Sequence, residues 1–165
     1  MAVKVYCMAD RNFQDKTLLL GPGKYYKLEI IKTIEAVHGE LWYVGKDCNG
    51  LRHLIPVSIY GKYGIEPGNV IYCRLDWINC QGRFFFEPRH PYYSEGETYS
   101  FELLGLQNCE EGSKTCYAMV RDIFGQELKT LPFNCSGIVS GKAKSLTCKV
   151  VRIKKAVPYL EVSVI

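Results

Sequence analysis

The fold is decided by Gly23-Lys24-Tyr25-Tyr26-Lys27-Leu28-Glu29-Ile30, because Gly96-Glu97-Thr98-Tyr99-Ser100-Phe101-Glu102-Leu103 repeats its pattern 73 residues later. Further pairs of short motifs recur 74 or 75 residues apart: Asp47–Gly50 with Asp122–Gly125, Cys73–Arg74 with Cys148–Lys149, and Phe86–Glu87 with Leu160–Glu161. A nearly constant distance between separate pairs indicates that one supersecondary unit occurs twice in the chain.

The first copy has the residue pattern of five β-strands. From Tyr26 onward apolar side chains alternate with polar ones, which predicts a strand with one buried face. Asp47-Cys48-Asn49-Gly50 lies between the β-rich segments 41–46 and 51–57 and predicts a hairpin, because Asn-Gly readily adopts positive φ. Segments 70–78 and 83–87 complete the set, and 58–68 is expected to be a loop with at most one helical turn.

The second copy predicts the same five strands, with Leu146, Cys148 and Val150 facing inward and Thr147, Lys149 and Val151 outward. Five antiparallel strands, with the longest connection between the third and the fourth, match the OB-fold, a small Greek-key barrel. We therefore predict an all-β protein with two tandem five-stranded OB-fold barrels, at 23–88 and 96–165. The connector 89–95 contains Pro91 and two tyrosines and is expected to be stiff and extended.

The segment 1–22 resembles the last hairpin of such a unit. Tyr6-Cys7-Met8-Ala9-Asp10 is similar to Tyr72-Cys73-Arg74-Leu75-Asp76, and an apolar triplet follows in each case. Two interpretations stay open: an extra N-terminal β-hairpin that is the remnant of a preceding repeat in a longer array, or a hairpin added to cover an exposed sheet edge.

The order of motifs in the first copy resembles the OB-type RNA-binding repeat of the S-one family, which is named for a small-subunit ribosomal protein. Gly50-Leu51-Arg52-His53 matches the Gly-Leu-x-His that often starts the third strand of that family, and Gly68-Asn69-Val70 is a looser match before the fourth. The second copy departs from the pattern at Gly125-Gln126-Glu127-Leu128. The resemblance implies an RNA-binding surface on strands two and three, at Tyr43, Lys46, Arg52 and His53.

Composition is that of a soluble globular protein, with 47% hydrophobic and 23% charged residues among 165. The longest apolar runs are far too short to span a membrane. Residues 1–20 carry five charged side chains and do not resemble a signal peptide. From this we expect a cytoplasmic protein without a membrane partner.

The eight cysteines do not suggest a metal site or a disulfide framework. Adjacent cysteines are not spaced as in zinc knuckles. Cys73 and Cys148 lie in alternating apolar runs and are expected to be small buried hydrophobes in a reducing cytosol. Cys80 and Cys109 lie in predicted turns, where they could be reactive, but no basic cluster supports this.

Aromatic and basic residues share the outward positions of the first copy. OB-folds bind single strands by stacking bases on exposed aromatic rings while basic groups follow the backbone. Tyr25 and Lys27 are predicted to point outward on the first strand, and Tyr72 and Arg74 on the fourth. On the second strand either Trp42 or Tyr43 is expected to point outward, depending on the phase of the strand. On the third strand the outward residue is either Arg52 or His53. An alternative for any one of these rings is packing within the core.

The second copy is basic at its C-terminal end. Residues 128–165 contain seven Lys or Arg residues and one Glu, whereas 94–127 contain two basic and seven acidic residues. Such a hairpin could neutralise phosphates, or its lysines could keep an edge strand from aggregating. The candidate phosphate contacts are Lys129, Lys149, Arg152 and Lys154.

Catalysis has little support in the sequence, because the three histidines are scattered and no nucleophile, phosphate-loop or metal-ligand motif is present. We therefore predict a non-catalytic module without cofactor or metal that binds single-stranded nucleic acid, with RNA favoured over DNA. The alternative is an OB-fold module that binds other protein subunits, or further repeats of a parent chain, within a larger assembly.

Overall fold

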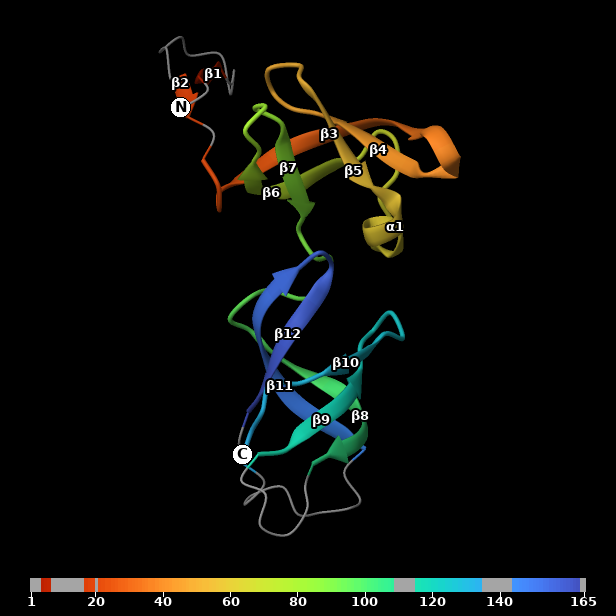
Figure 1. Cartoon of the computed structure of the whole chain (residues 1–165), viewed down its shortest axis with the longest axis vertical. Helices are drawn as coiled ribbons and strands as arrows, with labels where there is room; N and C mark the ends of the chain where they lie inside the picture. The colour runs from red at the N-terminus through yellow and green to blue at the C-terminus, as the bar shows by residue number, and fades with distance from the viewer. Residues whose placement is uncertain (1–3, 7–16, 20, 109–114, 135–143, 164–165) are drawn as a thin grey trace. The chain divides into compact units, whose positions relative to one another are not determined.

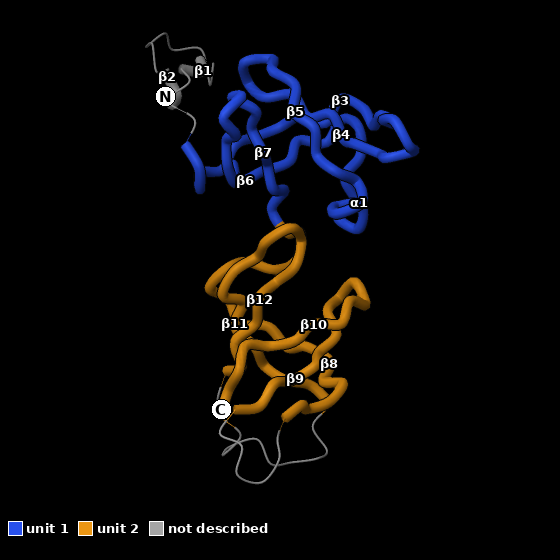
Figure 2. Tube along the Cα trace, viewed as in Figure 1, with its two compact units in different colours: residues 1–89 blue, residues 90–165 orange. Residues whose placement is uncertain are grey.

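The computed structural model describes residues 4–6, 17–19, 21–108, 115–134 and 144–163. The chain divides into two compact units, Met1–Arg89 and His90–Ile165 (Figure 2). The described residues form an all-β structure with two five-stranded antiparallel sheets and short helical turns (Figure 1). The predicted fold class is therefore confirmed at the level of an all-β protein.

The sheet of the first unit contains β3 (Tyr25–Glu35), β4 (Leu41–Lys46), β5 (Arg52–Pro56), β6 (Val70–Ile78) and β7 (Phe84–Pro88). Their order in the sheet is β5-β4-β3-β6-β7. A 3-10 turn, Val37–Gly39, joins β3 to β4. The connection from β5 to β6 contains α1 (Val57–Tyr60) and a 3-10 turn, Gly61–Tyr63, and so has more helical structure than the single turn expected.

The first sheet curls until its edge strands β5 and β7 come into contact. Bulges in β3, between Ile30 and Lys32, and in β6, between Leu75 and Trp77, increase the local twist. The His53 ring on β5 lies 4.7 Å from the Phe86 ring and 5.8 Å from the Phe84 ring on β7. These ring contacts join two strands that are not hydrogen-bonded neighbours.

The core of the first unit is built from the inward residues that the alternation predicted. Leu28 and Ile30 on β3, and Cys73 and Leu75 on β6, are fully buried. Their strand neighbours Tyr25, Lys27 and Glu29 are exposed, so the predicted phase of the first strand is confirmed. Gly45 on β4 lies against this core, and a Cβ there would stand 3.3 Å from the Cβ of Leu28.

The second unit has a sheet of β8 (Thr98–Gln107), β9 (Tyr117–Arg121), β10 (Glu127–Lys129), β11 (Ser145–Lys154) and β12 (Val157–Val162), in the order β10-β9-β8-β11-β12. Within each unit the strands therefore follow the same order. Leu146, Cys148 and Val150 are buried as predicted, and they pack in one cluster with Phe101 and Leu160. Beyond the end of β10, the Leu131 N–H donates to the Leu160 carbonyl at 2.7 Å.

The repeated Asp-x-x-Gly motif forms the same turn in both units. One carboxylate oxygen of Asp47 accepts the N–H groups of Asn49 and Leu51, both at 2.9 Å. Asp122 accepts those of Phe124 and Gln126 in the same way. Gly50 and Gly125 have φ values of 80° and 77°, which favour glycine. The hairpin predicted at Asp47–Gly50 is confirmed by the antiparallel pairing of β4 with β5.

The connector 89–95 is packed against the second unit through Tyr93. The Tyr93 ring is buried in the core of that unit, and its hydroxyl accepts the N–H of Ile123. His90 is also buried, and its Nδ1 accepts the N–H groups of Tyr92 and Tyr93. Burial lowers the pKa of His90 to about 4 although Asp122 acts in the opposite direction, so the ring is neutral at physiological pH.

The N-terminal hairpin predicted within 1–22 is present in part. Strands β1 (Lys4–Tyr6) and β2 (Thr17–Leu19) pair antiparallel, with Val5 opposite Leu18. The segment between them, 7–16, lies outside the described residues. The origin of the hairpin in a preceding repeat stays a prediction.

The expectation of a chain without disulfides is wrong. Cys48 and Cys116 are each disulfide-bonded. Cys73 and Cys148 are free and buried as predicted, and burial raises the pKa of both thiols, that of Cys148 to about 11. Cys80 is free and exposed, whereas the prediction for Cys109 lies outside the described residues. Because disulfides persist mainly in oxidising compartments, the two bonds count against the expected reducing cytosol, and the cytoplasmic location stays a prediction.

Candidate nucleic-acid interface

The outward side of β3 and β6 carries two half-exposed tyrosines in adjacent cross-strand rows. Lys27 on β3 stands opposite Tyr72 on β6, and Tyr25 stands opposite Arg74. Tyr25 is 52% exposed and Tyr72 is 50% exposed. The strands β6 and β7 continue this side with Trp77 and Phe85, which face each other in register. We call these six residues the outer aromatic face: Tyr25, Lys27, Tyr72, Arg74, Trp77 and Phe85.

The two cations of the outer aromatic face differ in their surroundings. Lys27 is exposed, and its Nζ lies 5.6 Å from the centre of the Tyr72 ring, within range of a cation–π contact. Arg74 is mostly buried, and its Nη2 lies 2.7 Å from Oε2 of Glu87 on β7. The Arg74 guanidinium is thus held by a carboxylate, whereas the Lys27 ammonium is open to solvent and to a ligand phosphate.

Trp77 and Phe85 were missed by the sequence analysis. Strict alternation from Cys73 and Leu75 would place Trp77 inward, but the bulge after Leu75 adds one residue and turns Trp77 outward. The Trp77 ring is 49% exposed and lies on the Phe85 ring, with centroids 4.3 Å apart and planes 11° apart. A bulge leaves no clear mark in a sequence, so this pair could be found only from the structure.

Tyr43 and His53, which the family resemblance placed on the binding surface, are buried. They are 6% and 7% exposed, respectively. Tyr43 stands opposite Ile55, inside the sheet, and burial raises the pKa of its hydroxyl. His53 is enclosed by the two phenylalanines of β7, and its Nε2 lies 3.0 Å from Oδ2 of Asp47. The expectation that either ring points outward is therefore wrong, because the strand phase directs both into the curled sheet.

Lys46 and Arg52, the other two residues of that expectation, do lie on the outer side of β4 and β5. They stand opposite each other in the pairing of the two strands. Lys46 is half-buried, and its Nζ lies 2.8 Å from Oε2 of Glu29. Arg52 is exposed. Two adjacent cations could hold one phosphate, but the half-exposed tyrosines lie on β3 and β6 rather than beside them.

The corresponding side of the second unit is basic but poor in aromatic rings. Lys149 stands opposite Thr98 and Glu161, where the first unit has Arg74 opposite Tyr25 and Glu87. Arg152 stands opposite Tyr159 and occupies the place that Trp77 has in the first unit. Lys149 and Arg152 are exposed, and Lys154 is half-buried. Among the described residues of this side, the exposed ring is that of Tyr159, beside several cations.

Lys129 lies apart from that group, on β10. It is exposed, and its Nζ lies 4.1 Å from the centre of the Tyr117 ring on β9. Three of the four basic residues predicted in the second unit, Lys149, Arg152 and Lys154, thus lie on β11 of the C-terminal hairpin, and Lys129 lies on β10.

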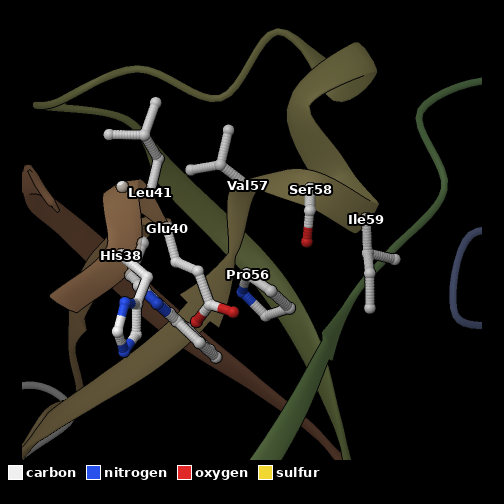
Figure 3. Close-up of a pocket in the computed structure, with 9 residues that line it drawn as sticks. His38, Glu40, Leu41, Pro56, Val57, Ser58 and Ile59 are labelled. Carbon is white, nitrogen blue, oxygen red and sulfur yellow. The ribbon is translucent and has the colours of Figure 1, made fainter. Parts of the chain in front are cut away.

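An apolar pocket of about 640 Å³ opens beside the turn between β3 and β4 (Figure 3). One wall comes from His38, Glu40 and Leu41, and the other comes from Pro56–Ile59, at the corner between β5 and α1. Gly39 and Trp42 complete the lining. The lining is mainly apolar, with the imidazole of His38 and the carboxylate of Glu40 as its ionisable groups.

Among the described residues, no group of three or more His, Cys, Asp or Glu side chains could hold a metal ion. None of the described helices has the length and hydropathy needed to cross a membrane. Comparison of the chain with protein-family models gives no match, and comparison with curated protein sequences gives none either. The proposals for function consequently depend on the geometry of the two units.

Proposed function

We propose that this protein binds single-stranded nucleic acid, with RNA favoured over DNA, on the outer aromatic face of its first unit and without catalysis. The observation that carries the proposal is the pair of cross-strand rows in which half-exposed Tyr25 and Tyr72 alternate with Arg74 and Lys27. Aromatic rings accept any base by stacking, and the exposed ammonium of Lys27 beside them can neutralise a phosphate, whereas Arg74 is paired with Glu87.

We also propose that both units are OB-type barrels of the S-one kind and arose by duplication. The order of strands within each sheet, the contact between β5 and β7 and the shared Asp-x-x-Gly turn support this assignment. The second unit lacks the Gly-Leu-x-His motif, and its structure differs from that of the first unit at the position of the histidine. His53 closes the first sheet, and Leu128 stands at the equivalent position of the second.

The energetics of the proposed interface are sufficient for weak to moderate affinity. Each stacked base contributes about 1–3 kcal/mol. Two stacked bases therefore contribute about 2–6 kcal/mol, and a phosphate contact at Lys27 adds a salt-dependent term. A dissociation constant near 1 μM requires about 8 kcal/mol. We expect binding in the micromolar range at low salt, with little preference for base sequence.

The test is a fluorescence-anisotropy titration of labelled single-stranded RNA and DNA oligonucleotides at about 50 mM and about 200 mM salt. The double substitution Tyr25→Ala and Tyr72→Ala should weaken binding by about tenfold or more, because both stacking rings are lost. Tyr92→Ala is the matched control, since Tyr92 is a 55% exposed tyrosine of the second unit. The proposal fails if the full chain does not bind either nucleic acid, or if the double variant binds as tightly as the parent.

A second candidate function, protein binding, is favoured by the apolar pocket beside the β3–β4 turn. Leu41 is half-exposed at its wall, and Val37 in the adjacent turn is largely exposed. An apolar side chain of a partner would fit such a lining, and its affinity would depend little on salt. Leu41→Asp should abolish that binding and leave oligonucleotide binding unchanged, so one pair of titrations separates the two candidates.

A further inference from the structure

Trp77 and Phe85 form a stacked aromatic pair that the two tyrosine rows do not use. The rings are nearly parallel and offset, the arrangement that aromatic pairs prefer over a direct sandwich. The guanidinium of Arg83 also lies by Phe85, with its Cζ 5.5 Å from the Phe85 ring centre. Phe85 thus supports Trp77 from the side of β7, while the indole stays 49% exposed.

Trp77 is half-exposed, and it follows the part of β6 that pairs with the segment leading into β3. There the sheet continues into a Gly-Pro-Gly turn, and the Gly23 N–H donates to the Leu75 carbonyl just before Trp77. A Cβ added at Gly21 or at Gly23 would meet no heavy atom within 4 Å. The turn before β3 thus places Gly23 beside Leu75, and the 49% exposure of Trp77 leaves part of its surface accessible to a flat ring.

We propose that Trp77 is a third base-stacking site, which extends the outer aromatic face along β6 so that the first unit holds three consecutive nucleotides. The inference rests on the proposed nucleic-acid binding and adds a specific site to it. Tyr72 and Arg74 are two residues apart on β6, and the bulge places Trp77 in the next outward row. Outward rows along a strand are about 6.6–6.8 Å apart, comparable with the phosphate-to-phosphate step of an extended single strand.

The charged groups nearest this row are Arg83 and the half-buried Asp76, which precedes Trp77 at the bulge. Arg83 adds a cation beside Phe85. The carboxylate of Glu87, which would repel phosphates, is bonded to Arg74. In the second unit the positions of Trp77 and Phe85 are taken by Arg152 and Tyr159. The second sheet thus forms with an arginine and a tyrosine at these two positions, so the fold itself does not require the stacked Trp77–Phe85 pair.

The experiment uses the full chain, in which Trp42 and Trp77 are the only tryptophans. In the Trp42→Phe variant all indole fluorescence comes from Trp77, and oligouridylates of one to six residues should quench it on binding. Trp77→Ser should weaken binding of the hexamer about tenfold, and Trp77→Phe should restore part of the affinity because a smaller ring still stacks. Trp42→Phe, which alters the half-buried tryptophan of the pocket, is the matched control and should bind like the parent.

Quenching of Trp77 fluorescence on binding, together with a loss of oligonucleotide affinity in Trp77→Ser, supports the third site. If Trp77→Ser binds as tightly as the parent while Tyr25→Ala and Tyr72→Ala weaken binding, the third site is refuted and the proposed function stands. If no oligonucleotide binds the parent chain, both proposals are overturned. Urea unfolding of Trp77→Ser, followed by the fluorescence of Trp42, checks that the variant is folded.

Discussion

Removing the Asp47 carboxylate should destabilise the first unit far more than a typical surface substitution. Asp47 is buried, and one oxygen accepts two backbone N–H groups of the β4–β5 turn while the other lies 3.0 Å from Nε2 of His53. Asp47→Ala leaves two partly buried N–H donors and one buried imidazole nitrogen without this acceptor.

The magnitude follows from the number of bonds lost. Hydrogen bonds to charged groups contribute about 1.5–3 kcal/mol each, and a buried polar group left without a partner costs about 1–3 kcal/mol. Because these terms overlap and water can reach the turn, we expect a loss of about 4 kcal/mol for Asp47→Ala. A unit of this size has a total stability of roughly 5 kcal/mol, so the variant should be close to unfolding at room temperature. Asp47→Asn keeps an oxygen for both N–H groups and should lose only about 1–2 kcal/mol.

The second unit provides the matched control. Asp122 accepts two N–H groups in the same geometry, but Leu128 stands where the first unit has His53. Asp122→Ala should therefore cost about 3 kcal/mol in its own unit, less than Asp47→Ala by the contribution of the histidine. The difference between the two substitutions reports the Asp47–His53 interaction relative to the electrostatic effect of Asp122 on His90.

The assay is urea unfolding followed by two signals. Both tryptophans lie in the first unit, so indole fluorescence reports on that unit, whereas far-UV circular dichroism reports on both. Asp47→Asn and Asp47→Ala should shift the fluorescence transition to a lower urea concentration. Asp122→Ala should shift to a lower urea concentration the part of the circular dichroism transition that comes from the second unit. A loss below about 1 kcal/mol for Asp47→Ala would refute the reasoning, because it would mean that water replaces the carboxylate without penalty.

Two other predictions concern the second unit and the turn glycine. The pKa of His90 is about 4 in the folded state and 6.5 in the unfolded state. The neutral ring therefore contributes fully to the free energy of unfolding above pH 6.5. This free energy falls by up to about 3 kcal/mol as the pH falls towards 4, because the unfolded state binds the proton more readily. His90→Asn, whose side-chain oxygen could accept the same two N–H groups, should flatten the dependence of unfolding on pH from 7 to 4.5, and an unchanged slope would contradict this cause. Gly50→Ala should lower the free energy of unfolding by about 1 kcal/mol, because Gly50 has φ of 80° in open space and only backbone strain acts. Gly21→Ala, also in open space but without positive φ, should be neutral in the same urea titration, and equal losses in both variants would argue against strain.

The candidate site was predicted where alternation is regular and was missed where it is interrupted. Tyr25 and Lys27 precede the bulge in β3, and Tyr72 precedes the bulge in β6, so a period of two placed all three correctly on the outside. Trp77 follows the bulge, and the same period would have turned it inward. Tyr43 and His53 were assigned from a family resemblance rather than from phase, and the structure buries both.

The sequence by itself determined the all-β class, the positions of the strands and the turn at Asp47–Gly50, because local alternation and turn chemistry depend only on neighbouring residues. Only the tertiary structure decided which rings stay in water. The curl of the first sheet brings β5 against β7 and encloses His53, and a one-residue bulge exposes Trp77. Both effects arise from contacts and twist between strands far apart in the chain, which no local pattern records. The same holds for the disulfides of Cys48 and Cys116, since bonding requires two sulfurs to meet in space.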